Sequence, residues 1–150
     1  MQKIIAIILF IISFFTTGDM TKANVTLYKD LTAGDSKAVF VFENNTGKAL
    51  SKDIKVEKVE KEFLGQWIEV SFNQSYLELA STSSSSFENR IYPGEKEDIY
   101  VDFMAVIAGI PVEIPLTSGN YRITVSFKTD GYSKVAEGSV TANFTVAQAA

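Results

Sequence analysis

Apolar side chains divide the chain into a short hydrophobic start and a longer part in which they alternate with polar ones. Residues 4–15 are apolar except for Ser13, whereas from Asn24 onward the pattern has a period of two far more often than 3.6. A period of two is that of a β-strand, whose successive side chains point to opposite faces. The clearest alternation covers residues 121–128, with inward positions expected for Tyr121, Ile123, Val125 and Phe127. The longer part is therefore predicted to be all-β.

Similar patterns predict six more strands. The expected strands are 25–28, 37–43, 54–59, 66–72, 98–106, 121–128 and 138–146. Residues 37–43 are apolar on both faces, which indicates a central strand, and Val59 is out of phase, which indicates a bulge or the end of its strand. Residues 54–59 and 66–72 are expected to form a hairpin. About seven short strands without an amphipathic helix predict an antiparallel β-sandwich.

Two longer stretches are expected to be surface loops. Residues 73–89 include the run Ser83–Ser86 and lose the alternation, with at most a short strand near 76–79. Residues 108–120 contain Pro111 and Pro115, and the segment 110–115 could be held extended between these prolines.

The hydrophobic start has the order of a secretory signal peptide. Lys3 precedes the apolar run, and small and polar residues follow it. As a helix, the run would reach about 18 Å, well short of the roughly 30 Å hydrocarbon core of a bilayer. We expect cleavage at Ala23–Asn24, with Gly18–Asp19 as the second choice, and hence a signal peptide at 1–23 and one domain at 24–150. An uncleaved N-terminal anchor is the alternative.

Composition restricts the chemistry. The 150 residues include no cysteine and no histidine, and the formal net charge is −4. The absence of both residue types excludes disulfides, zinc sites built from cysteine or histidine, a Ser-His-Asp relay and attachment of a lipid to cysteine. A mildly acidic chain is also a poor partner for nucleic acid or anionic membranes.

Acidic side chains are the remaining candidates for catalysis or metal binding. Two carboxylates about 5–9 Å apart can hydrolyse a glycosidic bond, and the candidates are Glu95, Glu97, Asp98 and Asp102. Solvated strand faces explain these residues equally well, so we expect no enzyme. Asp130 beside Gly131, or Asp30 with Asp35, could contribute to a calcium site, but the spacing of a calcium loop is missing. No metal or cofactor is expected.

Several residues are expected to have structural roles: Trp67, Pro93, Gly94, Gly119, Tyr121 and Arg122. Trp67 is predicted to fill the core between the sheets, with a ligand-stacking surface position as the alternative. The hydroxyl of Tyr121 is predicted to cap a nearby loop carbonyl as a tyrosine corner. Arg122 is predicted to face outward and to pair across strands with Glu95, Asp98 or Asp102.

The order of these motifs resembles a known family. Four segments, taken in order, resemble the immunoglobulin-like domains of proteins exported by Gram-positive-type bacteria. They are 54–59, Gly65-Gln66-Trp67, Pro93-Gly94-Glu95 and 118–123. The resemblance covers about residues 25–146 and implies a non-catalytic exported module, with no catalytic residues to transfer. The serine-rich insert at 73–89 departs from it. A weaker resemblance is to small bacterial β-sandwich proteinase-inhibitor domains.

Four glycosylation sequons begin at Asn24, Asn44, Asn73 and Asn143. In a eukaryotic secretory pathway they would be acceptors on exposed positions, whereas in a bacterium they are by-products of a polar β-surface. The resemblance favours the bacterial interpretation.

The expected function is that of an extracellular or cell-surface immunoglobulin-like module in protein interaction or extracellular structure. Its partner would be a protein or a component of the cell envelope, and self-association through sheet edges is compatible with the sequence. The first alternative is an extracellular proteinase inhibitor that presents the segment 110–115. A carboxylate-based hydrolase is the remote alternative.

Overall fold

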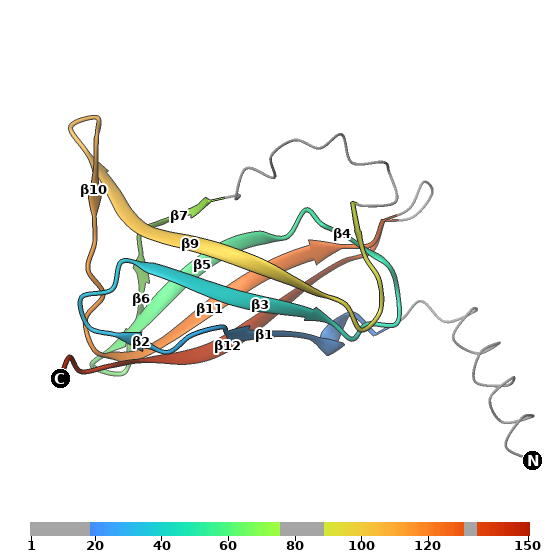
Figure 1. Cartoon of the computed structure of the whole chain (residues 1–150), viewed down its shortest axis with the longest axis horizontal. Helices are drawn as coiled ribbons and strands as arrows, with labels where there is room; N and C mark the ends of the chain where they lie inside the picture. Colours follow the sequence, from blue (N-terminus) through green and yellow to red (C-terminus); the bar gives the residue numbers. More distant parts are fainter. Residues whose placement is uncertain (1–18, 76–88, 131–134) are drawn as a thin grey trace, which may run out of the picture.

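The computed structural model describes residues 19–75, 89–130 and 135–150 (Figure 1). These residues form β-strands joined by turns, with one short 3-10 helix, η1 (Met20–Lys22), and no α-helix. The all-β class and the predominantly antiparallel pairing agree with the prediction. Within the described part of the chain, no helix has the length and apolar character needed to cross a membrane.

The first sheet has the order β1-β3-β9-β10, with β7 paired to β9 off this path. Its strands are β1 (Ala23–Leu27), β3 (Lys37–Asn44), β7 (Phe72–Ser75), β9 (Lys96–Ile107) and β10 (Ile110–Glu113). The predicted central strand at 37–43 corresponds to β3, which lies between β1 and β9. Ala38, Phe40 and Phe42 on one face of β3 are buried in the core, whereas Val39 and Val41 on the other face are half-buried.

The second sheet has the order β2-β12-β11-β5-β6. Its strands are β2 (Leu31–Thr32), β5 (Lys55–Phe63), β6 (Gln66–Val70), β11 (Gly119–Lys128) and β12 (Glu137–Ala147). Strand β2 pairs with β12 in parallel, whereas the other pairings in this sheet are antiparallel. Two short strands, β4 (Leu50–Ser51) and β8 (Arg90–Ile91), pair separately.

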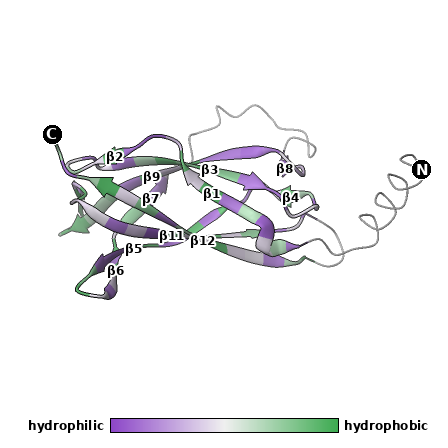
Figure 2. Ribbon diagram, turned by 90° about the horizontal axis from the view of Figure 1, so that it is seen from below, coloured by the Kyte–Doolittle hydropathy of each residue, from purple (hydrophilic) through white to green (hydrophobic). Residues whose placement is uncertain are grey.

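Aromatic rings from the two sheets meet in the core. Phe40 on β3 packs edge-on against Phe144 on β12 at 5.1 Å between centroids, and Phe42 packs against Phe127 at 5.2 Å. The predicted inward residues of β11 are at most 3% exposed, and polar residues occupy the alternate positions, as Figure 2 shows along the strands. Full burial of one phenylalanine side chain contributes roughly 1.5–3 kcal/mol, so the alternation directs stabilising groups into the space between the sheets.

Strand β5 explains the phase change at Val59. The register between β5 and β11 shifts between Thr124 and Val125, because one extra residue is inserted between Val56 and Lys58. The bulge predicted for this strand is thus present, but the strand does not end there: it continues to Phe63 and pairs with β6 as the predicted hairpin.

Other predicted boundaries were wrong. The strand predicted at 66–72 is two strands, since the chain leaves the second sheet after Val70 and joins the first at Phe72. Residues 31–32 form β2, where no strand was predicted, and the predicted loop at 108–120 contains β10. The predicted loop at 73–89 begins within β7, and its serine run lies outside the described residues, as does most of the predicted signal segment.

Candidate functional site

Two of the carboxylates considered for hydrolysis are too far apart to act as a pair. Asp98 and Asp102 lie on the same strand, β9, four residues apart, which at 3.3 Å per residue separates their Cα atoms by about 13 Å. The side chain of Glu97 is on the opposite face of β9. Burial raises the pKa of its carboxyl group, although the positive charge of Lys52 lowers it. Glu95 instead accepts a hydrogen bond from the backbone N–H of Tyr92 at 3.0 Å. The separation of Asp98 and Asp102 exceeds the distance of about 5–9 Å that glycoside hydrolysis needs, whereas Asp98 and Glu95 lie near enough to Glu97 to raise its pKa further.

Two of the acidic residues considered for calcium, Asp130 and Asp35, have partners within the chain. Asp130 forms an ion pair with Arg90, and the Asp35 carboxylate accepts a hydrogen bond from the N–H of Thr32 at 2.9 Å. Residue Gly131 lies outside the described residues. Within 19–75, 89–130 and 135–150, no cluster of three or more acidic side chains is placed to hold a metal ion.

Pro93 and Gly94 form a tight turn that docks on a buried asparagine. The N–H of Glu95 donates to the carbonyl of Tyr92 at 2.9 Å, and Gly94 has a φ of +85°, as position three of a type II turn requires. The N–H of Gly94 then donates to the carbonyl of Asn44 at 2.7 Å. Asn44 is fully buried, and its side-chain amide donates to the carbonyl oxygens of Lys48 and Ile91 at 2.7 and 2.8 Å. The turn thus helps to close one end of the core.

The burial of Asn44 also excludes glycan attachment at one of the four sequons in the folded chain. The amide nitrogen of Asn44 is committed to two internal hydrogen bonds, so it cannot carry a glycan in the folded chain. Asn24, Asn73 and Asn143 are exposed.

Tyr121 has the hydrogen bond that the sequence predicts. Its hydroxyl donates to the backbone carbonyl of Thr117 at 2.6 Å, while its ring is buried and stacks on Phe144 at 5.3 Å. The preceding Gly119 has a φ of +148°, and a Cβ there would lie 2.9 Å from the side chain of Lys61. The two residues together set the path by which the chain enters β11.

Trp67 and Arg122 do not have the predicted partners. Trp67 is not part of the core: it lies on the outer face of the second sheet, with the Arg122 guanidinium carbon 4.2 Å from its ring centroid. Arg122 faces outward as predicted, but its two hydrogen bonds, at 2.8 and 3.3 Å, go to Glu60 on β5. Glu95, Asp98 and Asp102 belong to the first sheet or its turn and are not its partners.

Glu60 was not identified from the sequence. It is buried on the outer face of the sheet, only 6% exposed, and Lys58 lies 3.6 Å from its carboxylate. The hydrogen bonds from Arg122 hold the pKa of this carboxyl group below its ordinary value. Because the predicted strand stopped at Val59, no pattern in the sequence placed Glu60 beside Arg122.

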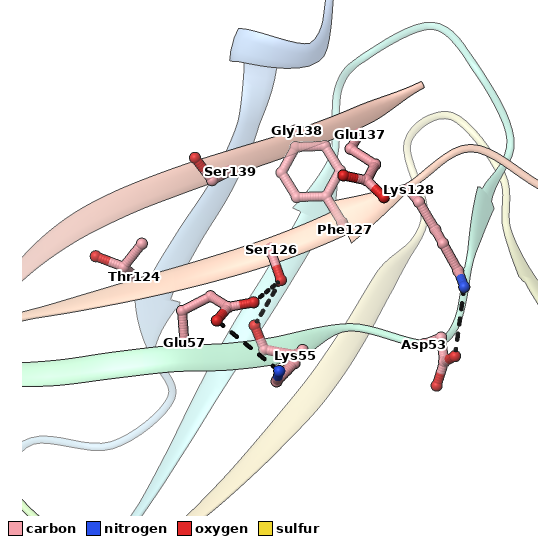
Figure 3. Close-up of a pocket in the computed structure, with 10 residues that line it drawn as sticks. All are labelled: Asp53, Lys55, Glu57, Thr124, Ser126, Phe127, Lys128, Glu137, Gly138 and Ser139. Carbon is pink, nitrogen blue, oxygen red and sulfur yellow. Dashed lines mark hydrogen bonds and ion pairs between the residues drawn. The ribbon is translucent and has the colours of Figure 1, made fainter. Parts of the chain in front are cut away.

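A polar hollow of about 660 Å³ lies over β5, β11 and β12 on the same outer face (Figure 3). Its charged side chains largely neutralise one another: Lys55 lies 3.9 Å from Glu57, and Lys128 lies 3.8 Å from Asp53. The hydroxyl of Ser126 donates to Glu57 at 2.7 Å. The two lysines are paired and the aromatic residue Phe127 is only 3% exposed, so this hollow offers little specificity.

The hairpin of β9 and β10 exposes a cluster of apolar side chains, as the β5–β6 hairpin also does at Phe63, Leu64 and Ile68. The β9–β10 hairpin projects from the body at the end where the C-terminus lies (Figure 1). Val106, Ile107, Ile110 and Val112 are 70%, 61%, 64% and 42% exposed. The turn residues Ala108 and Gly109 both have positive φ, +52° and +81°, as a two-residue type I′ turn requires. We call this segment, residues 104–113, the apolar hairpin.

Pro111 removes a hydrogen-bond donor from the free edge of the apolar hairpin. The N–H of Ile114 donates to the carbonyl of Phe103, so in this antiparallel register Val112 and Ile110 also form hydrogen-bonded pairs with β9. The backbone of Pro111 therefore faces away from β9, where a proline offers no N–H to an incoming strand. Along this edge of β10 a partner would therefore meet side chains rather than extend the sheet.

The sequence contained a signal for this hairpin. Ala108-Gly109 stands between apolar residues on both sides, as in a two-residue hairpin, but the prolines favoured a loop. No family model, curated protein or solved structure matches this chain.

Proposed function

We propose that the chain is an exported, non-catalytic immunoglobulin-like module that binds a protein or cell-envelope partner through the apolar hairpin. The observation that carries this proposal is the exposure of four aliphatic side chains on one projecting hairpin. Contiguous exposed apolar surface of this kind marks interaction sites in soluble domains.

The order of the strands supports the immunoglobulin-like part of the proposal. Immunoglobulin-type domains have one sheet in the order A-B-E-D and another in the order G-F-C, to which variable-type domains add C′. Strands β1, β3, β9 and β7 follow the first order, and β12, β11, β5 and β6 follow the second. Tyr121 then stands near the start of strand F with its hydroxyl bonded upstream, which is the position of the tyrosine corner.

The side chains of the apolar hairpin favour docking over catalysis. Ile107 and Ile110 form the last pair before the turn and share the face that continues from buried Phe103. Val106 faces the other side together with Pro111. Apolar groups therefore cover both faces of the tip, and burying them against a partner would release water from each.

A proteinase inhibitor remains the alternative, because Ile110–Glu113 is extended and exposed. Its backbone is already paired with β9 along one edge, and Pro111 lacks a donor on the other. Proteases commonly bind inhibitors by main-chain pairing, so the structure supports side-chain docking better. Stoichiometric inhibition of any protease in a broad panel would favour the inhibitor instead.

Site-specific photocrosslinking in the source organism tests the proposal. A photoreactive phenylalanine derivative at Ile110 should give an adduct of defined mass, and the same group at exposed Tyr28, on another part of the first sheet, should not. Adding Ile107→Thr, which keeps β-propensity but removes apolar surface, should weaken the adduct. Equal adducts at both positions, or none, would contradict the proposal. Fractionation and N-terminal sequencing of the native protein would test export separately.

A further inference from the structure

The outer face of the second sheet carries a row of four side chains at the end near Tyr121. The register pairs Trp67 with Glu62 and Asn120 with Thr145. The pairing of Tyr121 with Lys61 places Asn120 next to Glu62. The row therefore runs across β6, β5, β11 and β12, and it borders a hollow of about 270 Å³ to which Asn143 also contributes.

Trp67 is held in this row by a chain of interactions. Arg122 packs on the indole ring at 4.2 Å, and Glu60 fixes the guanidinium through two hydrogen bonds. Glu60 is in turn near Lys58. An aromatic side chain that is already fixed loses little conformational entropy when a ligand contacts it.

Polar groups around the hollow are not used for folding. Among the described residues, the side chains of Glu62 and Asn143 and the indole N–H of Trp67 make no hydrogen bond within the chain. Asn120 accepts only a long one, 3.5 Å, from the hydroxyl of Thr145. The hollow therefore combines an aromatic wall with free amide, carboxylate and N–H groups.

We propose that this hollow is a binding site for a sugar unit of a neutral glycan. The C–H groups of a pyranose ring pack against aromatic side chains, and its hydroxyls both donate to and accept from planar amides and carboxylates. This proposal goes beyond the docking role of the apolar hairpin and does not depend on it.

The volume of the hollow and the charge around it restrict the class of ligand that can bind. A hollow of about 270 Å³ is smaller than the roughly 300–1,000 Å³ of sites for drug-sized molecules, so it suits one sugar unit, and its position on an open sheet face lets a longer chain continue. Exposed Glu62 and Glu69 and the chain's net charge of −4 oppose anionic polysaccharides. A protein partner would need a broader apolar contact than this small polar hollow provides.

The tryptophan provides a direct assay, because Trp67 is the only one in the chain. The full chain would be titrated with dextran, galactomannan, xyloglucan, mixed-linkage β-glucan, xylan and chitin oligosaccharides while tryptophan emission is recorded. We expect a saturable change in emission with at least one of these probes. Asn143→Ala should weaken that binding at least fivefold. Trp67→Ala should abolish retardation of the chain in native gels that contain the polysaccharide.

Two control variants test whether a loss of glycan binding is specific to this hollow. Asn24→Ala removes an exposed asparagine from the first sheet and should leave binding unchanged, as should Ile107→Thr in the apolar hairpin. Thermal unfolding of each variant would verify that it is folded. The anionic polysaccharides alginate and polygalacturonate would be titrated in the same way. The proposal is overturned if no neutral probe changes the emission, if Asn143→Ala and Asn24→Ala bind equally well, or if only these anionic polysaccharides bind.

Discussion

Removal of the Tyr121 hydroxyl tests whether its hydrogen bond stabilises the fold. Tyr121→Phe deletes the 2.6 Å bond to the Thr117 carbonyl but keeps the ring stacked on Phe144. A typical intramolecular hydrogen bond contributes about 1 kcal/mol net, and an unsatisfied buried acceptor costs up to about 3 kcal/mol. Thr117 is exposed, so water can replace the lost donor and the larger cost does not apply. We expect a loss of about 1 kcal/mol in the free energy of unfolding.

Equilibrium urea unfolding measures this loss. With a urea dependence of about 2 kcal/mol per molar, the midpoint should fall by about 0.5 M, and tryptophan fluorescence and far-ultraviolet circular dichroism should give the same curve if unfolding is two-state. The matched control is Tyr28→Phe, which removes a hydroxyl from a side chain that is 72% exposed. If the two variants unfold at the same urea concentration, the Tyr121 bond does not stabilise the fold and the reasoning is refuted.

Three further predictions concern the core, the ion pair and the N-terminus. Asn44→Ala should lower the free energy of unfolding by about 3 kcal/mol, because loss of the buried amide leaves its hydrogen-bond partners unpaired. Asn24→Ala, at an exposed position, should change the urea midpoint little. The lowered pKa of Glu60 means that its charge stabilises the fold at neutral pH and that this contribution is lost as the pH falls through the folded pKa. Glu60→Gln should therefore lower the urea midpoint near pH 7, and its difference from the unmodified chain should shrink as the pH falls below the ordinary pKa of glutamate; a difference independent of pH would contradict this. Finally, a chain of residues 19–150 should melt at a higher temperature than one of residues 24–150, because the shorter chain lacks η1 and its contacts with β12.

The strands and inward faces could be predicted because alternation is a local property. The inward residues of β11 and the central position of β3 follow from side chains a few positions apart. Strand order depends on residues far apart in sequence, and alternation contains no information about it. Arg122 and Glu60 are 62 positions apart, and their contact requires β5 to lie beside β11. The outward direction of Arg122 was therefore predictable, but its partner was not.

The error at Trp67 has a different origin. Alternation in 66–72 places Trp67 on the same face as Glu69, opposite Ile68 and Val70, and thus on the polar side of the sheet. The expectation of a core tryptophan came from its residue type and from domains that bury one on strand C. In the present strand order Trp67 lies on β6, one strand beyond that position. The local pattern was the better guide.

The two proposed surfaces should respond differently to the loss of the Tyr121 hydroxyl. The base of the apolar hairpin is held by backbone bonds, since Leu116 donates to the carbonyl of Asp35 and its own carbonyl accepts from Gly34. The start of β11, where Asn120 borders the glycan hollow, is paired with β12, and the bond from Tyr121 to Thr117 anchors the turn that leads into it. Tyr121→Phe should therefore weaken binding at the hollow while crosslinking from the apolar hairpin persists. Equal losses at both surfaces would mean that the substitution loosens the whole end of the domain.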